Sequence, residues 1–156
     1  MNNVEFLADQ LRRAHEGEAW HGPSLRETLA GVDAAMASAR PVAQAHTIWE
    51  LVRHVAAWVP VVGRRLEGES VELPAAEDWP APGKASEAAW QNTLAALDDE
   101  TKKLRDKISK LPEDALRKGV PGGNYSVRFM LEGVIQHHLY HAGQIALLKK
   151  MVSARS

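Results

Sequence analysis

The chain has 156 residues with a formal net charge of −1, and 45% of them are hydrophobic against 25% charged, which is typical of a globular domain with its own core. No basic cluster, apolar run of membrane-spanning length or signal-peptide pattern occurs, so we expect a cytoplasmic protein with no nucleic-acid and no membrane partner. Cysteine is absent, which excludes disulfides, thiolate ligands and a cysteine nucleophile, so any thiol chemistry must use an external thiol. Residues 1–156 are expected to form a single domain.

Apolar residues at helical spacing predict helices from the start of the chain, beginning with residues 3–17. Residues 24–27 have the form of a capping box, so a second helical segment is expected from Ser24 to about Val32. A short turn of helix and a loop follow over residues 33–45.

Three longer helices complete the pattern. A capping box at Thr47 opens a helix that runs to about Glu67, and the other two helices span residues 86–110 and 126–152. Connections of a dozen or more residues separate these helices, and connections of that length can cross a bundle. We therefore predict an all-α protein that folds as a four-helix bundle with long crossover connections.

The last of these helices carries the most informative motif of the chain. His137 and His141 are four residues apart and therefore share one helix face, with Gln144 on the next turn. Their neighbours on that face are apolar, which places two imidazoles in a core where their nitrogens require partners. His138 lies about 100° round the helix, and we do not expect it to be a ligand.

A histidine pair with this spacing supplies two ligands to a divalent metal ion, and a third ligand must come from elsewhere. His54 is the best candidate because it lies at the edge of the apolar face of its own helix, although taken alone a histidine at such a border is more often not a ligand. Three histidines would leave a coordination position open, as catalytic metal sites do. Spacing alone leaves a second interpretation equally open, in which the pair is hydrogen-bonded within the core.

The remaining candidate residues are interpreted from their neighbours. Trp20 and Trp58 are core or loop anchors by default and are also candidates for the wall of a pocket, while Trp79 is expected to pin the connection over residues 68–84 to the body. Three histidines, His15, His21 and His46, are interpreted as surface or loop residues. Three acids are interpreted as solvated charges that are also candidates for proton transfer, namely Glu16, Glu18 and Glu132.

Three stretches carry a resemblance to a known family, namely residues 20–25, 48–58 and 133–145. The third stretch contains the motif His-x-x-x-His-x-Gly-Gln, and the second has a histidine four residues before a tryptophan. On these stretches the chain resembles the DinB-like (DinB/YfiT) superfamily of metal-dependent enzymes. The resemblance implies a four-helix bundle of up-down-down-up topology.

Carried over position by position, the resemblance implies metal ligands at His54, His137 and His141, with nickel or zinc as the divalent ion. It also implies a homodimer. The final helix fits a dimer because it is apolar on the face of Leu131 and Ile135 as well as on the metal-binding face.

The activity implied by the resemblance is the use of a low-molecular-weight thiol, such as bacillithiol, mycothiol or glutathione, as a co-substrate at the metal. A cation near a thiol favours the reactive thiolate, so we expect an S-transferase first and metal-assisted hydrolysis of a small-molecule substrate second. The predicted substrate pocket is formed by Trp20, Trp58, Tyr140 and Gln144. The alternatives are a non-catalytic metal- or ligand-binding stress-response protein and a helical dimer whose histidines only hydrogen-bond to each other.

Overall fold

The long helices begin at side-chain caps, because Asn2, Thr47, Ser86 and Ser126 each accept a hydrogen bond from a backbone N–H of the first turn. The computed structural model describes residues 1–154 and contains helices but no strand in that range. In chain order the elements are α1 Asn3–His15, α2 Leu25–Leu29, α3 Ala34–Ser38, α4 Ile48–Leu66, α5 Ala75–Asp78, α6 Glu87–Ile108, the 3-10 helix η1 Glu113–Arg117 and α7 Val127–Ser153. The all-α prediction is confirmed. No helix within the described range has the length and apolar character needed to cross a membrane.

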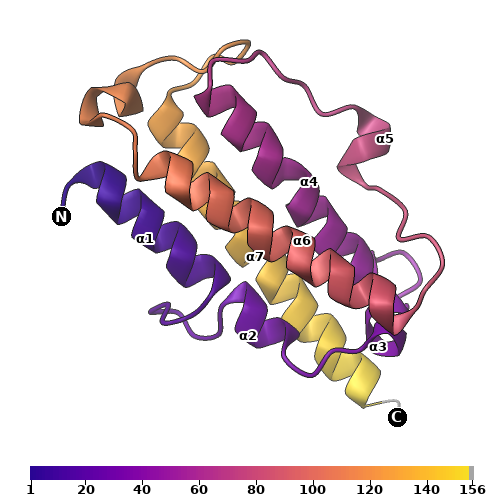
Figure 1. Cartoon of the computed structure of the whole chain (residues 1–156). Coiled ribbons are helices and arrows are strands. Elements are labelled where there is room, and N and C mark those ends of the chain that lie inside the picture. Colours follow the sequence, from indigo (N-terminus) through magenta and orange to yellow (C-terminus); the bar gives the residue numbers. More distant parts are fainter. Residues whose placement is uncertain (155–156) are drawn as a thin grey trace.

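The four long helices pack as a bundle in which α1 and α4 each contact both α6 and α7. Figure 1 shows that α1 and α7 run in one direction along the bundle and α4 and α6 in the other. The connection between α4 and α6 therefore returns along the bundle, and it contains enough residues to do so. Fully buried apolar side chains fill the space between the helices, among them Leu11, Trp49, Leu97, Leu131 and Ile145.

The connection between α4 and α6 carries the short helix α5, which packs against α4. Trp79 follows α5 directly and packs against the hydrophobic core. This tryptophan attaches the connection to the body of the protein, in the way that the sequence suggested. The contact brings the end of α5 beside the part of α4 that carries His54.

One face of α7 differs from its sequence interpretation. Leu131 is completely buried and Ile135 is partly buried against the core, so the chain's own helices cover this side of α7. The face of Leu131 and Ile135 is therefore not free for a dimer contact, which removes the argument that the sequence pattern gave for a dimer. The homodimer itself stays a prediction.

Candidate metal centre

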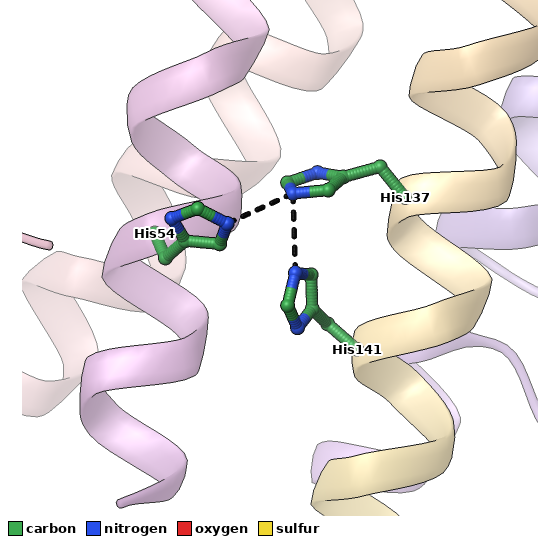
Figure 2. A group of neighbouring side chains, drawn as sticks. All are labelled: His54, His137 and His141. Carbon is green, nitrogen blue, oxygen red and sulfur yellow. Dashed lines mark hydrogen bonds between the residues drawn. The ribbon is translucent and has the colours of Figure 1, made fainter. Parts of the chain in front are cut away.

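Three histidines from two helices meet between α4 and α7. His54 comes from α4, His137 and His141 come from α7, and one ring nitrogen of each lies within 4.8 Å of the others (Figure 2). The Nε2 atom of His137 is 2.9 Å from Nε2 of His54 and 3.1 Å from Nε2 of His141. His54 and His141 are buried and His137 is half-buried, so the group lies at the edge of the core. The structure thus brings together the three side chains that the sequence analysis selected as ligands.

Contacts at the opposite ring nitrogens fix the orientation of two of these imidazoles. The Nδ1–H of His54 donates to the backbone carbonyl of Asp78 at 2.7 Å, and the carboxylate of Asp78 lies 3.1 Å from the same nitrogen. The Nδ1–H of His141 donates to Oε1 of Gln144 at 2.6 Å. With the protons on Nδ1, the Nε2 lone pairs of His54 and His141 both point toward His137. Histidines that bind metals are held by such hydrogen bonds to their second nitrogen.

Hydrogen bonds alone do not satisfy the three Nε2 atoms that face one another. The Nε2 atom of His137 carries at most one proton, and it faces two nitrogen lone pairs at hydrogen-bond distance. One of the two close contacts is then left without a hydrogen between the nitrogens. Nitrogens that each lie about 2.0–2.1 Å from one ion are themselves about 3 Å apart, which matches the distances from Nε2 of His137 to the other two Nε2 atoms. The residues present therefore fit a divalent metal ion better than the purely hydrogen-bonded core pair.

Burial keeps the imidazoles of His137 and His141 in the neutral form that binds metals. Desolvation, and next the neighbouring charges of His141 and His54, lower the pKa of His137 to about 3. Desolvation also lowers the pKa of His141, although its hydrogen bond to Gln144 acts in the opposite direction. Both rings are consequently neutral rather than imidazolium at neutral pH, so a cation there is not repelled by a positively charged ring.

Helix α5 and the residue after it form a cover over His54. The indole N–H of Trp58 donates to the carboxylate of Asp78 at 2.7 Å, which holds the end of α5 against α4. The ring of Trp79 stacks on His54 with centroids 3.8 Å apart and on His46 with centroids 3.6 Å apart. Sequence reasoning did not find Asp78, because the connection that carries it shows no periodicity that would indicate which side chain reaches α4.

A cavity of about 480 Å³ opens beside the histidines. His54 and His137 line one part of it, and apolar side chains of α4 and α7 form its walls. The complete lining consists of His54, Trp58, Val62, Arg65, Asp78, Tyr125, Phe129, Met130, Gly133, Val134 and His137. The cavity therefore connects two of the three candidate ligands with a largely apolar space of a size that suits a small molecule.

The four residues of the predicted substrate pocket have different positions. Trp58 lines the cavity. Trp20 is fully exposed and lines a separate hollow with Phe6 and Leu139, because the loop after α1 carries it to another side of the bundle. Tyr140 is 66% exposed, and its ring lies 5.0 Å from that of His141, outside the lining of the cavity. Gln144 orients His141 and does not line the cavity.

The interpretation of His15 as a surface residue was wrong. His15 ends α1 and is 2% exposed, with its Nε2 atom 2.8 Å from the carboxylate of Asp98 on α6. Its ring contacts that of the fully buried His138 edge to face. His138 donates from Nδ1 to the carbonyl of Val134 and is not part of the three-histidine group, as expected. Histidine at the end of a helix rich in charge resembles a surface residue, but the last turn of α1 faces α7.

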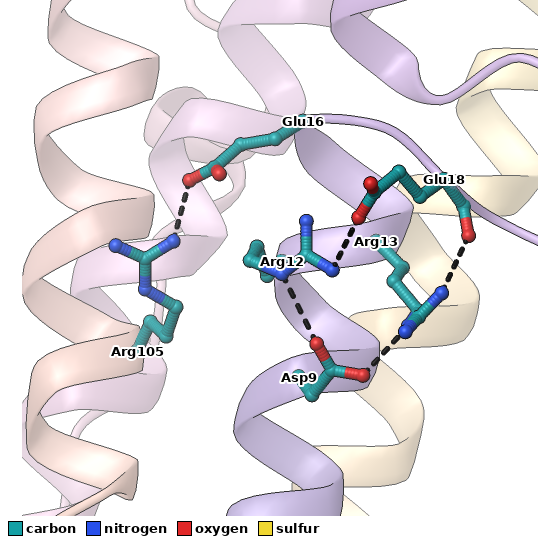
Figure 3. A network of polar contacts seen from close by, with 6 residues as sticks. All are labelled: Asp9, Arg12, Arg13, Glu16, Glu18 and Arg105. Atoms are coloured by element: carbon teal, nitrogen blue, oxygen red, sulfur yellow. Dashed lines mark hydrogen bonds and ion pairs between the residues drawn. The ribbon is translucent and has the colours of Figure 1, made fainter.

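The acids that were considered for proton transfer form ion pairs away from the cavity. Glu16 pairs with Arg105, Glu18 pairs with Arg12, and Asp9 bridges Arg12 and Arg13 in the same network (Figure 3). Glu132 pairs in the same manner with an arginine one turn away on α7. None of these acids lines the cavity, so the solvated-charge interpretation holds for all three candidates.

The fold and the site define a class of protein, an all-α helical bundle with a buried three-histidine group suited to a divalent metal. The family model of the DinB superfamily matches residues 18–145, a range that includes the three histidines. The chain therefore belongs to the DinB superfamily. No curated protein and no solved structure matches it.

Proposed function

We propose that this protein is a metal-dependent enzyme that activates either a low-molecular-weight thiol or a water molecule for attack on a small-molecule substrate. The observation that supports the proposal best is the position of the three-histidine group beside the apolar cavity. A divalent ion held there would favour the thiolate or hydroxide form of a bound thiol or water. His54, His137 and His141 would hold this ion, which we propose to be nickel or zinc.

The other residues of the site position and shield the reacting groups. Asp78 and Gln144 hold the proton on Nδ1 of His54 and His141 and so keep both Nε2 lone pairs directed at the same point. Trp79 covers one face of His54, which limits the approach of water from that side. Substrate would enter along the wall formed by Trp58 and Val134. An apolar wall beside a polar centre favours transfer to a substrate over transfer to solvent.

The thiol version is preferred over hydrolysis because the resemblance to the DinB-like superfamily implies a thiol co-substrate, and the absence of cysteine from the chain is compatible with a thiol from solution. Reduced thiols are maintained in the cytoplasm, so this version includes a cytoplasmic location as part of the proposal. The cavity also favours an enzyme over a stress-response protein that only binds a metal ion. A protein that only stores an ion needs no such space beside its ligands, whereas a catalyst must admit a substrate.

Elemental mass spectrometry on protein without a histidine tag tests the metal centre. We expect about one nickel or zinc ion per chain, and loss of the ion in a His137→Ala/His141→Ala double variant. A His21→Ala variant is the matched control, because His21 is exposed and lies outside the three-histidine group. A folded wild-type chain that stays metal-free after exposure to both ions would contradict the metal centre.

A thiol-transfer assay tests the reaction. A monohalobimane serves as the electrophile, and the rate with each of several common thiols is compared between metal-loaded and metal-free protein. We expect a rate enhancement that requires the ion and is absent in the double variant. Equal rates for the loaded and metal-free protein with every thiol would exclude the transferase, and a panel of ester and amide substrates would then test hydrolysis.

The homodimer is also proposed from the resemblance. Several apolar side chains remain exposed along α7 at helical spacing, namely Phe129, Tyr140, Leu147 and Met151. Light scattering at several concentrations measures the oligomeric state directly. A monomer at all concentrations would reject this part of the proposal and leave the metal centre unaffected.

A further inference from the structure

The cavity beside the histidines contains a second polar group, formed by Arg65 and Tyr125. Both residues line the cavity, and the guanidinium donates from Nη1 to the phenol oxygen of Tyr125 at 2.8 Å. Apolar side chains such as Val62 and Met130 form other parts of the lining. The proposed reaction uses neither Arg65 nor Tyr125.

Arg65 is separated from His54 by three turns of α4. Eleven residues correspond to about 16 Å along the helix axis and return to nearly the same helix face. Helical side chains lean toward the N-terminus, and the guanidinium carbon of Arg65 lies 5.9 Å from the ring centroid of Trp58. The arginine head group therefore extends back along the cavity wall toward the histidines. A ligand of moderate length can contact both polar groups at once.

The charge of Arg65 has no carboxylate partner within salt-bridge distance in the described part of the chain. Its Nε and Nη2 atoms donate to the carbonyl of Val71 at 3.0 and 2.7 Å, and Nη1 donates to Tyr125. All of these acceptors are neutral. The adjacent Arg64, in contrast, pairs with the carboxylate of Glu69 at 2.6 Å. A guanidinium has five N–H groups and stays charged, so Arg65 retains a full positive charge and two unused donors.

Tyr125 adds a further donor at the same place. Its hydroxyl oxygen accepts from Arg65, which leaves the hydroxyl hydrogen available for another acceptor. The ring is held in position by Phe129, whose centroid is 5.7 Å away, and by close packing on Gly123. A side chain at position 123 would put its Cβ 3.0 Å from the Tyr125 ring, so glycine permits this approach.

The carboxylate that lines the cavity does not neutralise Arg65. Asp78 accepts from Trp58 at 2.7 Å and lies 3.1 Å from Nδ1 of His54, so it is committed to the histidine side of the cavity. The cavity consequently has a group suited to a cation at one position and a group suited to an anion at another. An apolar wall joins them.

We propose that Arg65 and Tyr125 bind an anionic group, most simply a carboxylate, on a ligand whose apolar body occupies the cavity. The position of the reacting atom near the histidines rests on the proposed function, whereas anion binding by Arg65 and Tyr125 does not require the metal. The substrate class is thus a molecule with a reactive end, an apolar middle and a carboxylate. The carboxylate belongs either to the electrophile or to the thiol.

Binding to metal-free protein tests the anion site without reference to the reaction. Titration calorimetry after chelation compares octanoate with octanol, which has the same apolar chain and no charge. We expect octanoate to bind about tenfold more tightly, as hydrogen bonds to charged groups allow. This preference should disappear in Arg65→Met and decrease in Tyr125→Phe. Arg64→Met is the matched control, because it removes a neighbouring arginine that pairs with Glu69 and does not line the cavity.

Two results would overturn the inference. One is equal affinity of the wild-type protein for octanoate and octanol. The other is an octanoate preference that is undiminished in Tyr125→Phe, or that survives in a folded Arg65→Met variant. The Tyr125 variant keeps the contacts of Arg65 with Val71, so the test remains valid if removal of the arginine unfolds the chain.

The metal-loaded enzyme identifies the source of the carboxylate. If the thiol carries the charge, Arg65→Met should raise the KM for mercapto-octanoate but not for octanethiol. If the electrophile carries the charge, the same variant should raise the KM for charged electrophiles. A protein that prefers octanoate but binds no metal would support the anion site and reject the proposed function. The two proposals therefore fail separately.

Discussion

Replacement of His138 by leucine should remove a large part of the acid sensitivity of this protein. His138 is fully buried, donates from Nδ1 to the carbonyl of Val134 and has no hydrogen-bond partner at Nε2 within the described chain. Desolvation, and next the nearby charge of His15, lower its pKa from 6.5 to about 4. Protonation of this ring in the folded state is therefore strongly unfavourable.

The sign and size of the effect follow from the two pKa values. Between pH 6.5 and 4 the unfolded chain binds a proton at this residue and the folded chain does not, so the free energy of unfolding decreases as the pH falls. With about 1.4 kcal/mol for each pKa unit, the loss is near zero at pH 7, about 2 kcal/mol at pH 5 and about 3 kcal/mol at pH 4. Such a loss is a readily measured fraction of the roughly 5–15 kcal/mol by which a domain is stabilised.

Urea unfolding of metal-free His138→Leu and wild type at pH 7 and pH 5 measures this contribution. Protonation of His137 occurs in both proteins and largely cancels in the difference between them, because the charge of His138 is only a minor cause of the lowered pKa of His137. We expect the variant to gain about 2 kcal/mol relative to wild type on going from pH 7 to pH 5. A His21→Gln control, at an exposed position, should keep the wild-type pH dependence. Parallel pH profiles for His138→Leu and wild type would refute the reasoning.

Three further results are expected. Asp78→Ala should weaken metal binding about 10–100-fold, measured by competition with a chelator dye, because His54 loses its carboxylate contact and the end of α5 loses its contact with Trp58. A saturating ion at about 100 times its dissociation constant should stabilise the wild type by about 2.7 kcal/mol in thermal unfolding, and the gain should vanish in the His137→Ala/His141→Ala variant. Trp90→Phe should cost about 1–3 kcal/mol in urea unfolding, since the buried indole N–H donates to the carbonyl of Val32 at 2.7 Å and phenylalanine leaves that carbonyl without its side-chain donor.

The helices were predictable because their signals are local. A cap such as Thr47 and the apolar spacing after it lie within a few residues, and α4, α6 and α7 agree with the expected ranges to within two residues at each end. The pair His137 and His141 is also local, since four residues of helix place both rings on one face. His54 lies 83 residues before His137, so its selection required the resemblance as well as the helix pattern.

The rest of the site depends on contacts between segments that no periodicity connects. Asp78 reaches His54 across 24 residues, through a connection whose path is set by how Trp79 packs. Arg65 contacts Tyr125 across 60 residues, and nothing in either local sequence indicates that the two meet at one cavity. Trp20 shows the reverse case, in which a motif shared with the family carries an aromatic side chain that lies outside the cavity.

The long connection between α4 and α6 links the fold to the chemistry. Two parallel neighbouring helices require a segment that returns along the bundle, and that segment is free to pass over the middle of α4. A tight turn between antiparallel helices would leave the Nδ1 side of His54 facing solvent. Here the returning segment places the carbonyl of Asp78 on that nitrogen and the ring of Trp79 on the imidazole face. The topology thereby converts a histidine at the border of an apolar face into one that is oriented for a metal.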